Sequence, residues 1–474
     1  MKLDYSKIGV LPRTINLQIL IDSLMSVGGF PIAVGGCVRD FLLGKKPNDI
    51  DIEVYGLKSS KLLKTLRLIG KINLVGKSFG VFRVSISNDK TDFFDVSMPR
   101  LEKKYAVGHK GFLIDQNSNL TFKQASLRRD FTINSMGYDF KSNKIIDPYN
   151  GYLDLKNGLL RHVSTSFNED PLRVFRACQF AARFNFKIHK STLKLCQNLK
   201  NELKSLPSER LFNEFKKLLL SKKPSIGFLS IVDTGAIALF PEISSLIGCP
   251  QEKKWHPEGD VWIHTLLVID EVAKLILKDN LNEEESLILL FASLCHDFGK
   301  PLVTCFEDGR IRSRNHESMG EIPTRSFLQK IGASQKLINS VVALVVNHLK
   351  PCQLFKVKSS LSNRAIRRLA IKVPIERLCR IAKADFLGRM TDDALSGYDP
   401  STEWLLKKSK ALLVQKEAPK SILLGRHLLN LGLKSGPLIG KLLKKSFIAQ
   451  IDGKFDNVDD AIVWLMKNNK INTS

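Results

Sequence analysis

The stretch that decides the fold is VGGCVRD at residues 34–40, followed by NDIDI at residues 48–52. An apolar run from Phe30 to Val34 leads into Gly35-Gly36 and then into a short helical pattern, which predicts a strand, a tight turn and a helix. The two glycines let backbone N–H groups approach a triphosphate without interference from Cβ atoms, and the helix N-terminus adds positive potential. This stretch predicts a phosphate-binding turn.

Two acids follow on the next predicted strand. Strict alternation places Asp49 and Asp51 on one face, while Ile50 and Ile52 turn to the core. Carboxylates this close repel unless a divalent cation lies between them, and Mg²⁺ shared with substrate phosphates is the common solution in polymerase-type sites. Asp95 on the Phe93 to Met98 run would complete a two-metal arrangement, with Asp92 as the alternative. Taken alone, such a pair is also compatible with a solvated sheet face.

Together these motifs resemble the active-site signature of the class II tRNA nucleotidyltransferase and bacterial poly(A) polymerase family, a branch of the polymerase-β-like superfamily. Cys37 stands where that family usually has another small residue. The resemblance implies that Asp49 and Asp51 bind Mg²⁺ as catalytic residues and that Asp95 assists them.

A second motif, RRDFTIN at residues 128–134, resembles the family motif whose arginines and asparagine contact the triphosphate and ribose. Arginine suits this role because its planar fork donates two hydrogen bonds to a phosphate. On its own the segment would be a surface arginine pair. The resemblance implies that these two motifs supply the following nucleotide-binding residues: Gly35, Gly36, Arg39, Arg128, Arg129, Asp130 and Asn134.

A third motif, NEDPLRVFR at residues 168–176, predicts a helix start, with Asp170, Arg173 and Arg176 on one helix face. An aspartate accepting from an exocyclic amino group, beside an arginine donating to a ring nitrogen, accepts cytosine and adenine and mismatches uracil and guanine. The segment resembles the base-reading motif of the family, which implies that these three residues contact the nucleotide. The alternative is an intrahelical salt bridge.

A later set of histidines and aspartates resembles an HD phosphohydrolase domain, notably CHDFGK at residues 295–300. The segment WHPEGDVWIH at residues 255–264 is similar to the HD domain fused to bacterial tRNA nucleotidyltransferases. Single histidines in helices are more often core or surface residues. The resemblance implies that a divalent transition metal is bound by His264, His296, Asp297 and Asp385, with His316 and His348 as second ligands or phosphate partners.

The composition agrees with a nucleic-acid partner. The chain has 474 residues, and its 73 Lys and Arg against 47 Asp and Glu give a net charge of +26, which favours a polyanion. A Lys-rich composition drawn from an AT-rich genome explains the charge equally well. The eight cysteines form no CxxC pair, and we identify neither a secretory signal nor an uncharged apolar run near the ~20 residues that cross a bilayer. We therefore expect no membrane association, and a cytoplasmic location.

The expected fold class is α+β: a polymerase-β-like head, then an all-α neck, a helical HD domain and a helical tail. The predicted boundaries are 1–157 for the head, 158–250 for the neck, 251–394 for the HD domain and 395–474 for the tail. A long mobile loop is expected from Met98 to Gln124. Lysines in the tail are predicted either to contact RNA phosphates or to form a solvated face.

The expected function is template-independent addition of C, C and A to the 3′ end of tRNA from CTP and ATP, with a second, HD-type phosphohydrolase or phosphodiesterase activity. Three alternatives remain. One is a poly(A) polymerase, or an enzyme that adds only CC or only A. The others are an HD hydrolase with a degenerate head and a non-catalytic basic RNA-binding protein.

Overall fold

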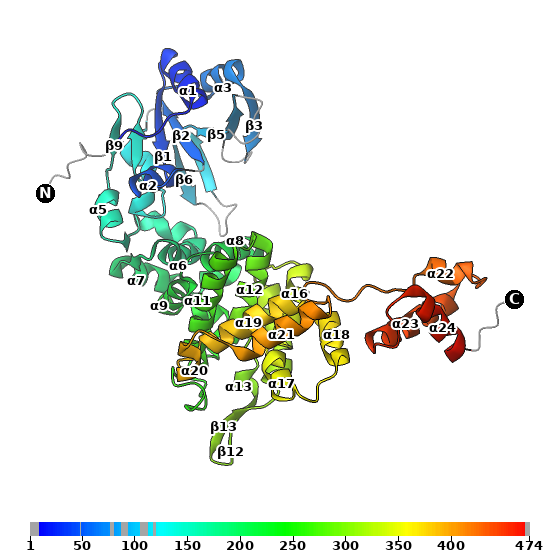
Figure 1. Ribbon diagram of the computed structural model, residues 1–474. Helices are drawn as coiled ribbons and strands as arrows, with labels where there is room; N and C mark the ends of the chain where they lie inside the picture. The colour runs from blue at the N-terminus through cyan, green and yellow to red at the C-terminus, as the bar shows by residue number, and fades with distance from the viewer. Residues whose placement is uncertain are drawn as a thin grey trace. The chain divides into compact units, whose positions relative to one another are not determined.

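The computed structural model describes residues 9–47, 49–75, 80–86, 93–104, 112–116 and 120–469. Asp92, the alternative third acid, lies outside these residues. The chain divides into two compact units, Met1–Leu239 and Phe240–Ser474 (Figure 1). The finer division into head, neck, HD domain and tail stays a prediction.

A seven-stranded sheet forms the centre of the head, in the order β3-β4-β5-β2-β1-β8-β9. Strands β2 and β5 pair in parallel, and the other neighbours pair antiparallel. The strands predicted at Phe30–Val34 and Phe93–Met98 are confirmed within one residue at each end, and the predicted strand that carries Asp51 is β2. The strands are β1 Phe30–Val34, β2 Ile50–Tyr55, β3 Lys71–Val75, β4 Val81–Ser85, β5 Phe94–Ser97, β8 Gly137–Asp139 and β9 Lys144–Ile146.

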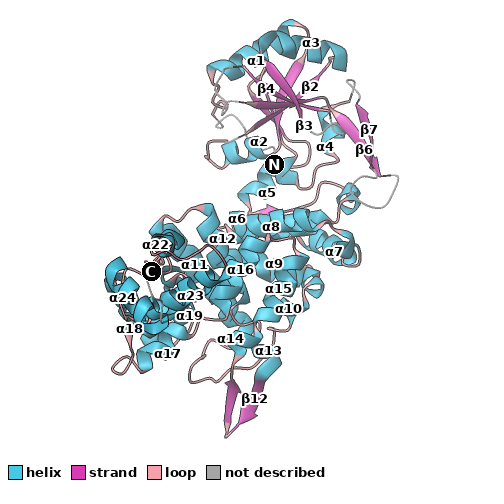
Figure 2. Cartoon of the chain, turned by 90° about the vertical axis from the view of Figure 1, so that its right-hand side faces the viewer, coloured by secondary structure: helices cyan, strands magenta, loops and turns pink. Residues whose placement is uncertain are grey.

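Short helices flank the sheet. Helices α1 and α3 pack against each other on one side of it (Figure 2), and the Thr14 side chain caps α1 by accepting from the Leu17 amide. The turn between β1 and β2 contains α2, as the sequence predicts. The helices of this region are α1 Ile15–Ser26, α2 Gly36–Leu42, α3 Ser59–Ile69, α4 Phe122–Ser126 and the 3₁₀ turn η1 Thr132–Asn134.

The segment from Met98 to Gln124 is not the single loop that the sequence predicts. Two strands, β6 Arg100–Lys104 and β7 Phe112–Gln116, pair antiparallel, and α4 begins at Phe122. Backbone hydrogen bonds between strands stabilise such a hairpin even where charged residues hide the alternating pattern. The prediction of a loop is therefore wrong where the two strands form. The rest of the predicted loop includes residues 105–111 and 117–119, which lie outside the described residues.

Helices follow the head. Helix α6 packs on α8 and α9 around three phenylalanines. The ring centroid of Phe215 lies 5.9 Å from that of Phe175 and 6.3 Å from that of Phe228. The short strands β10 Leu159–Leu160 and β11 Lys187–Ile188 pair in parallel. The helices are α5 Gly151–Lys156, η2 Thr165–Glu169, α6 Leu172–Phe184, α7 Lys190–Asn198, η3 Glu202–Ser205, α8 Ser208–Leu219, α9 Pro224–Asp233 and η4 Ala236–Leu239.

The second unit is built around α11, α12 and α19, which pack on one another. A hairpin of β12 Thr304–Glu307 and β13 Arg310–Ser313 projects from these helices (Figure 2). The helices are α10 Pro241–Ser244, α11 Val261–Asp279, α12 Glu283–Cys295, α13 Lys300–Val303, α14 His316–Met319, α15 Glu321–Lys330, α16 Gln335–Val345, α17 Lys350–Lys356, α18 Asn363–Lys372, α19 Ile375–Leu387, α20 Asp392–Leu395 and α21 Pro400–Ala411.

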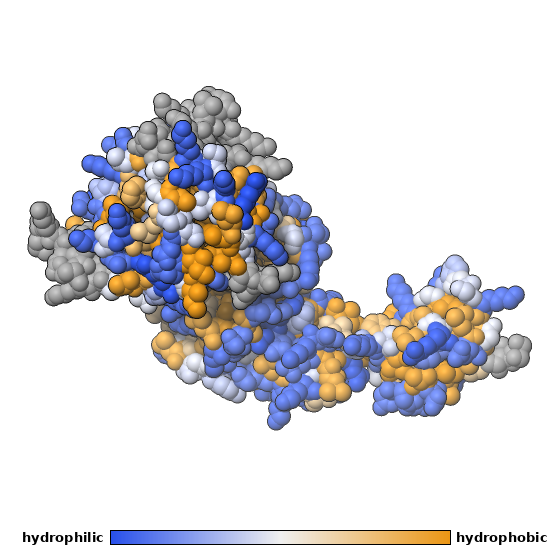
Figure 3. Space-filling model, turned by 90° about the horizontal axis from the view of Figure 1, so that it is seen from above, coloured by the Kyte–Doolittle hydropathy of each residue, from blue (hydrophilic) through white to orange (hydrophobic). Residues whose placement is uncertain are grey.

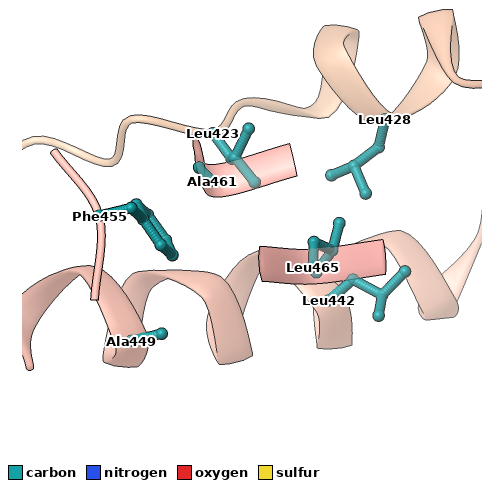
Figure 4. Packing of buried hydrophobic residues seen from close by; sticks show 7 residues of the cluster. All are labelled: Leu423, Leu428, Leu442, Ala449, Phe455, Ala461 and Leu465. Carbon is teal, nitrogen blue, oxygen red and sulfur yellow. The ribbon is translucent and has the colours of Figure 1, made fainter. Parts of the chain in front are cut away.

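The last three helices have a hydrophobic core of their own. Helices α22 Gly425–Asn430, α23 Pro437–Ile451 and α24 Val458–Asn469 enclose Leu423, Leu428, Leu442, Ala449, Phe455, Ala461 and Leu465 (Figure 4). Apolar side chains also show on the surface of this bundle (Figure 3). In the same helices, Leu438 and Val463 are 57% and 64% exposed.

One segment, Glu283–Val303, is long and apolar enough to cross a membrane by length and composition alone. Within the protein, however, 83% of its apolar window is buried, as expected for a core helix of a globular domain.

Candidate functional site

The paired acids lie at the start of β2, the central strand of the head sheet. Asp51 on β2 stands directly opposite Asp95 on the parallel strand β5, and Asp49 immediately precedes β2. Because β2 and β5 run in the same direction in register, Asp51 and Asp95 present their carboxylates on the same face. Arg83 donates to both oxygens of Asp95, at 2.8 Å each.

The surroundings of Asp51 change its acidity. Partial desolvation raises the pKa of Asp51 to about 6, and the neighbouring Asp95 and Asp49 carboxylates add to this shift, whereas Arg129 opposes it. A divalent cation that binds such a group of neighbouring carboxylates offsets their mutual repulsion. The donor set therefore fits a hard divalent cation.

Gly35 brings the backbone close to these acids. It precedes α2 with φ +75° and ψ −131°, a conformation that glycine adopts at little cost. A Cβ atom at this position would lie 3.1 Å from the Arg129 Nη1 atom and 3.9 Å from the Asp51 Oδ2 atom. The open turn beside Asp51 thus depends on glycine.

A chain of hydrogen bonds links α2 to α6 through the second motif. Arg39 donates to Asn134 Oδ1 at 2.6 Å, Asn134 donates to Asp130 at 2.9 Å, and Arg176 donates to Asp130 at 2.6 Å. Burial opposes ionisation of Asp130, but Arg176 and then Asn134 lower its pKa to about 2. Asp130 is therefore the anion that holds two of the predicted nucleotide-binding side chains in place.

Arg128 and Arg129 share a partner that the sequence analysis missed. The buried Glu53 carboxylate accepts from Arg128 at 2.5 Å and from Arg129 at 2.9 Å, and Tyr55 donates to it at 2.8 Å. Burial opposes ionisation of Glu53, yet the two arginines lower its pKa. The signal was present, because Glu53 stands two residues after Asp51 and so lies on the same face of β2.

The third motif differs in detail from its prediction. Asp170 has extended backbone angles, φ −125° and ψ 100°, and α6 begins only at Leu172, so Asp170, Arg173 and Arg176 do not share one helix face. The prediction failed because the residue before a proline is disfavoured from the helical conformation, so Asp170 stays extended before Pro171. Arg210 of α8, which was not predicted, donates to Asp170 at 2.8 Å. Arg173 donates to the backbone carbonyls of Ser166 and Arg128 at 2.7 and 2.6 Å.

Most of these side chains nevertheless line one pocket of about 380 Å³. Asp49, Asp95 and Arg128 are predicted site residues that do not line it, and Leu172, Phe180 and Arg210 line it without having been predicted. The predicted residues in the lining are Gly35, Gly36, Arg39, Asp51, Arg129, Asp130, Asn134, Asp170, Arg173 and Arg176.

The predicted HD residues converge inside the second unit. His264 comes from α11, Asp385 from α19, and the His296-Asp297 pair directly follows α12. The His264 Nε2 atom lies 3.1 Å from an Asp385 oxygen and 4.0 Å from an Asp297 oxygen, and the His296 Nε2 atom lies 3.2 Å from Asp297. All four side chains are buried.

His316 and His348 lie on the other side of Asp297. The His316 Nε2 atom is 3.3 Å from the Asp297 Oδ1 atom and 3.3 Å from the His348 Nε2 atom. Two groups of three possible ligands therefore share Asp297: His264, His296 and Asp297 form one, and Asp297, His316 and His348 form the other.

The backbone fixes the orientation of three of these rings. The Nδ1 atoms of His296, His316 and His348 lie 2.7, 2.8 and 2.7 Å from the carbonyl oxygens of Ser293, Ser313 and Val345. A carbonyl oxygen only accepts, so each Nδ1 carries the proton and each neutral ring has an Nε2 lone pair directed at the cluster. The His296 Nε2 atom and both Asp297 oxygens are buried without a hydrogen bond of good geometry. This donor set fits a transition metal.

Charge in this cluster is balanced by two cations that were not predicted. Lys300 lies 2.7 Å from Asp297, and Arg389 lies 3.2 Å from Asp385. Burial opposes ionisation of Asp297, but His296 and Lys300 lower its pKa. Burial, with His316 next, lowers the pKa of His348 to about 3, which keeps that ring neutral and able to bind a metal.

A pocket of about 800 Å³ opens onto this cluster. Its lining includes Asp297, His316, His348 and Asp385 together with the cations Lys300 and Arg389. Aromatic side chains form other parts of its wall, namely Trp255, Phe355, Phe386 and Tyr398.

Comparison with known proteins gives the family. Residues 32–161 match the poly A polymerase head domain, and residues 185–247 match a probable RNA and SrmB-binding site of polymerase A. A multifunctional CCA protein of Actinobacillus pleuropneumoniae is 36% identical over 366 residues, which cover 75% of this chain and 85% of the relative. This chain belongs to the multifunctional CCA protein family. A family member from Xanthomonas campestris is 32% identical over 431 residues, or 88% of this chain and 97% of the relative.

Solved structures show the same fold. A Bacillus stearothermophilus CCA-adding enzyme in complex with CTP matches with a TM-score of 0.64 and 20% identity, covering 97% of this chain and 98% of that one. A Thermotoga maritima CCA-adding enzyme complexed with tRNA matches with a TM-score of 0.57 and 20% identity, covering 96% of each chain. The predicted α+β fold class and the predicted family are confirmed.

Proposed function

We propose that this chain adds C, C and A to the 3′ end of tRNA from CTP and ATP, releasing pyrophosphate. The observation that carries the proposal is that Asp51 shares one pocket with Asp170 and Arg173. A carboxylate able to bind a cation thus lies beside a donor and acceptor pair able to read a base. Membership of the multifunctional CCA protein family supports the same activity, with a divalent metal.

The proposed metal ligands at this site are Asp49 and Asp51, assisted by Asp95. Bound Mg²⁺ would supply charge neutralisation for the triphosphate. Arg39 and Arg129 line the pocket and would donate to phosphate oxygens, with Gly35 and Gly36 leaving room for the approach. Arg128 and Asp130 would support these phosphate contacts indirectly. Arg128 donates to Glu53, and Asp130 accepts from Arg176.

Base selection is assigned to Asp170 and Arg173. The Asp170 carboxylate would accept from the exocyclic amino group of cytosine or adenine, and Arg173 would donate to the adjacent ring nitrogen. Uracil and guanine present a carbonyl and an N–H in these places and would mismatch. Since Asp170 already accepts from Arg210, base binding must share or replace this bond.

One assay tests the transferase proposal. The protein is incubated with tRNA ending before CCA, Mg²⁺ and labelled CTP or ATP, separately and together, and the products are sequenced. We expect two C residues followed by one A. Long A tracts would instead favour a poly(A) polymerase, and C-only or A-only products a specialist enzyme. Incorporation of UTP or GTP at comparable rates would refute the assignment of Asp170 and Arg173.

A second activity is proposed for the second unit. We assign hydrolysis of phosphomonoesters or cyclic phosphodiesters to His264, His296, Asp297 and Asp385, with His316 and His348 as further ligands or phosphate contacts. The supporting observation is the two groups of buried imidazoles that share Asp297, beside a large pocket. A divalent transition metal would supply Lewis acidity there. Hydrolysis of p-nitrophenyl phosphate and of 2′,3′-cyclic nucleotides with Ni²⁺, Co²⁺ or Mn²⁺ tests this, and Asp297→Asn should abolish it.

The remaining proposals concern organisation. We propose a head at 1–157, a neck at 158–250, an HD domain at 251–394 and a tail at 395–474, with tRNA as the macromolecular partner. A cytoplasmic location accords with a tRNA-processing family. Limited proteolysis followed by mass spectrometry tests the boundaries.

A further inference from the structure

We propose that Glu258 is a positioning residue that orients His264 toward the metal ligands. This inference rests on the proposed phosphohydrolase function. The Glu258 side chain is fully buried in a loop before α11, and a single oxygen, Oε1, lies 2.8 Å from the Nδ1 atoms of both His256 and His264. Its other oxygen accepts from the Met390 amide at 3.3 Å.

The contact with His264 fixes the tautomer of that ring. A carboxylate only accepts hydrogen bonds, so the His264 Nδ1 atom must carry the proton that it donates. The neutral ring then has its lone pair on Nε2, the atom that lies 3.1 Å from Asp385 and 4.0 Å from Asp297. His296, His316 and His348 use backbone carbonyls for the same purpose. Among these four described rings, only His264 uses a carboxylate, which also makes the imidazole a stronger ligand.

The contact with His256 has the same consequence on the pocket side. Its Nδ1 atom donates to Glu258, so the neutral His256 ring has an unprotonated Nε2 atom. His256 lines the 800 Å³ pocket, its side chain is 13% exposed, and within the described part of the chain its Nε2 atom has no protein hydrogen-bond partner. The ring stands edge-on to His264, with centroids 4.7 Å apart.

Metal binding tests the inference without any turnover. Full-length protein carrying Asp49→Asn and Asp51→Asn, which remove the proposed Mg²⁺ ligands of the head, is titrated with Co²⁺ and followed by visible absorption. Glu258→Gln cannot accept from both rings, and it should weaken Co²⁺ binding by roughly 10- to 100-fold and change the absorption spectrum. Glu271→Gln is the matched control, since it removes a carboxylate of α11 that pairs with the exposed Lys274 and should leave binding unchanged.

His256→Ala is a second comparison, because His256, Glu258 and His264 stand close enough together to hold an ion. If Glu258 acts by orienting His264, this variant should leave Co²⁺ affinity within about twofold. Circular dichroism and thermal unfolding of the full-length variants check that each has folded.

The outcomes separate the two proposals. If the parent protein binds no Co²⁺, the phosphohydrolase proposal and this inference both fail. If the parent binds Co²⁺ and Glu258→Gln binds it equally well with the same spectrum, the positioning role alone is overturned. A loss of Co²⁺ affinity in His256→Ala as large as that in Glu258→Gln would make both residues direct ligands and would also overturn the positioning role.

Discussion

At Gly35 the proposed chemistry depends directly on the backbone conformation. Its φ of +75°, and the 3.1 Å that would separate an added Cβ atom from Arg129 Nη1, act together against any side chain. We expect Gly35→Ala to cost roughly 1–3 kcal/mol in backbone strain and to displace Arg129. CTP incorporation should fall about tenfold or more, as measured by kcat/KM with tRNA lacking CCA.

Gly44 provides the control for this prediction. It has a similar φ of +71° but no heavy atom within 4 Å of an added Cβ. Gly44→Ala should therefore cost a comparable amount of stability while leaving kcat/KM nearly unchanged. Equal losses of activity in the two variants would show that strain alone, and not the approach to Arg129, explains the Gly35 effect.

The acidity of Asp51 predicts how the transferase responds to pH. Its pKa is raised to about 6, and the proton competes with the cation for the same oxygens. At limiting Mg²⁺, activity should therefore fall as the pH drops through about 6. A higher Mg²⁺ concentration should move this fall to lower pH, because the metal displaces the proton. Initial rates between about pH 5 and 8 at several Mg²⁺ concentrations check this, and an acidic limb that does not move with Mg²⁺ would contradict it.

At the scale of elements, strand β2 carries both the proposed metal ligand and a buried ion-pair cluster. The Glu53 side chain is 2% exposed and contacts Arg128 and Arg129. Removing one partner of a buried pair leaves the others uncompensated, so Glu53→Ala should lower the free energy of unfolding by about 3–5 kcal/mol. Urea denaturation followed by circular dichroism measures this loss.

A pair on the neighbouring strands is the comparison for Glu53. Arg83 is 38% exposed and pairs with Asp95, so Arg83→Gln should cost only about 0–1 kcal/mol. A Glu53→Ala loss as small as that of Arg83→Gln would mean that the Glu53 cluster contributes no more than a surface pair.

The sequence predicted those elements whose pattern is local. The alternation in β4 and β5 and the Gly-Gly turn before α2 need no distant partner to be recognised. The β6–β7 hairpin was not predicted. Its strands, Arg100–Lys104 and Phe112–Gln116, are stabilised by backbone hydrogen bonds to each other, which cannot be inferred from residue composition.

Two site residues that the sequence missed act through distant partners. Arg210 reaches Asp170 across 40 positions of the chain, and Glu53 accepts from Arg128 across 75. The cations Lys300 and Arg389, in contrast, pair with acids only three and four positions away. Glu258 likewise lies only six positions from His264, but a loop position gives no periodicity from which its direction can be inferred. Motif resemblance could identify residue types, and only the fold could pair them.

At the scale of the whole molecule, the two candidate sites lie in different compact units, residues 1–239 and 240–474. Each has its own acids, its own cations and its own pocket. The donors also differ in kind, since the head offers carboxylate oxygens and the second unit offers imidazole nitrogens as well. Hard Mg²⁺ suits the first set, and a transition metal suits the second.

This separation predicts that the two activities can be removed independently. Asp51→Asn should reduce CCA addition by at least about 100-fold, because a metal ligand is lost, while phosphatase activity with added Co²⁺ stays within about twofold. Asp297→Asn, which alters the residue shared by both imidazole groups, should do the reverse. Both activities are measured on the same preparations of full-length protein. If Asp297→Asn reduced CCA addition as strongly as phosphatase activity, while the melting temperature of the head stayed unchanged, the two sites would be coupled rather than independent.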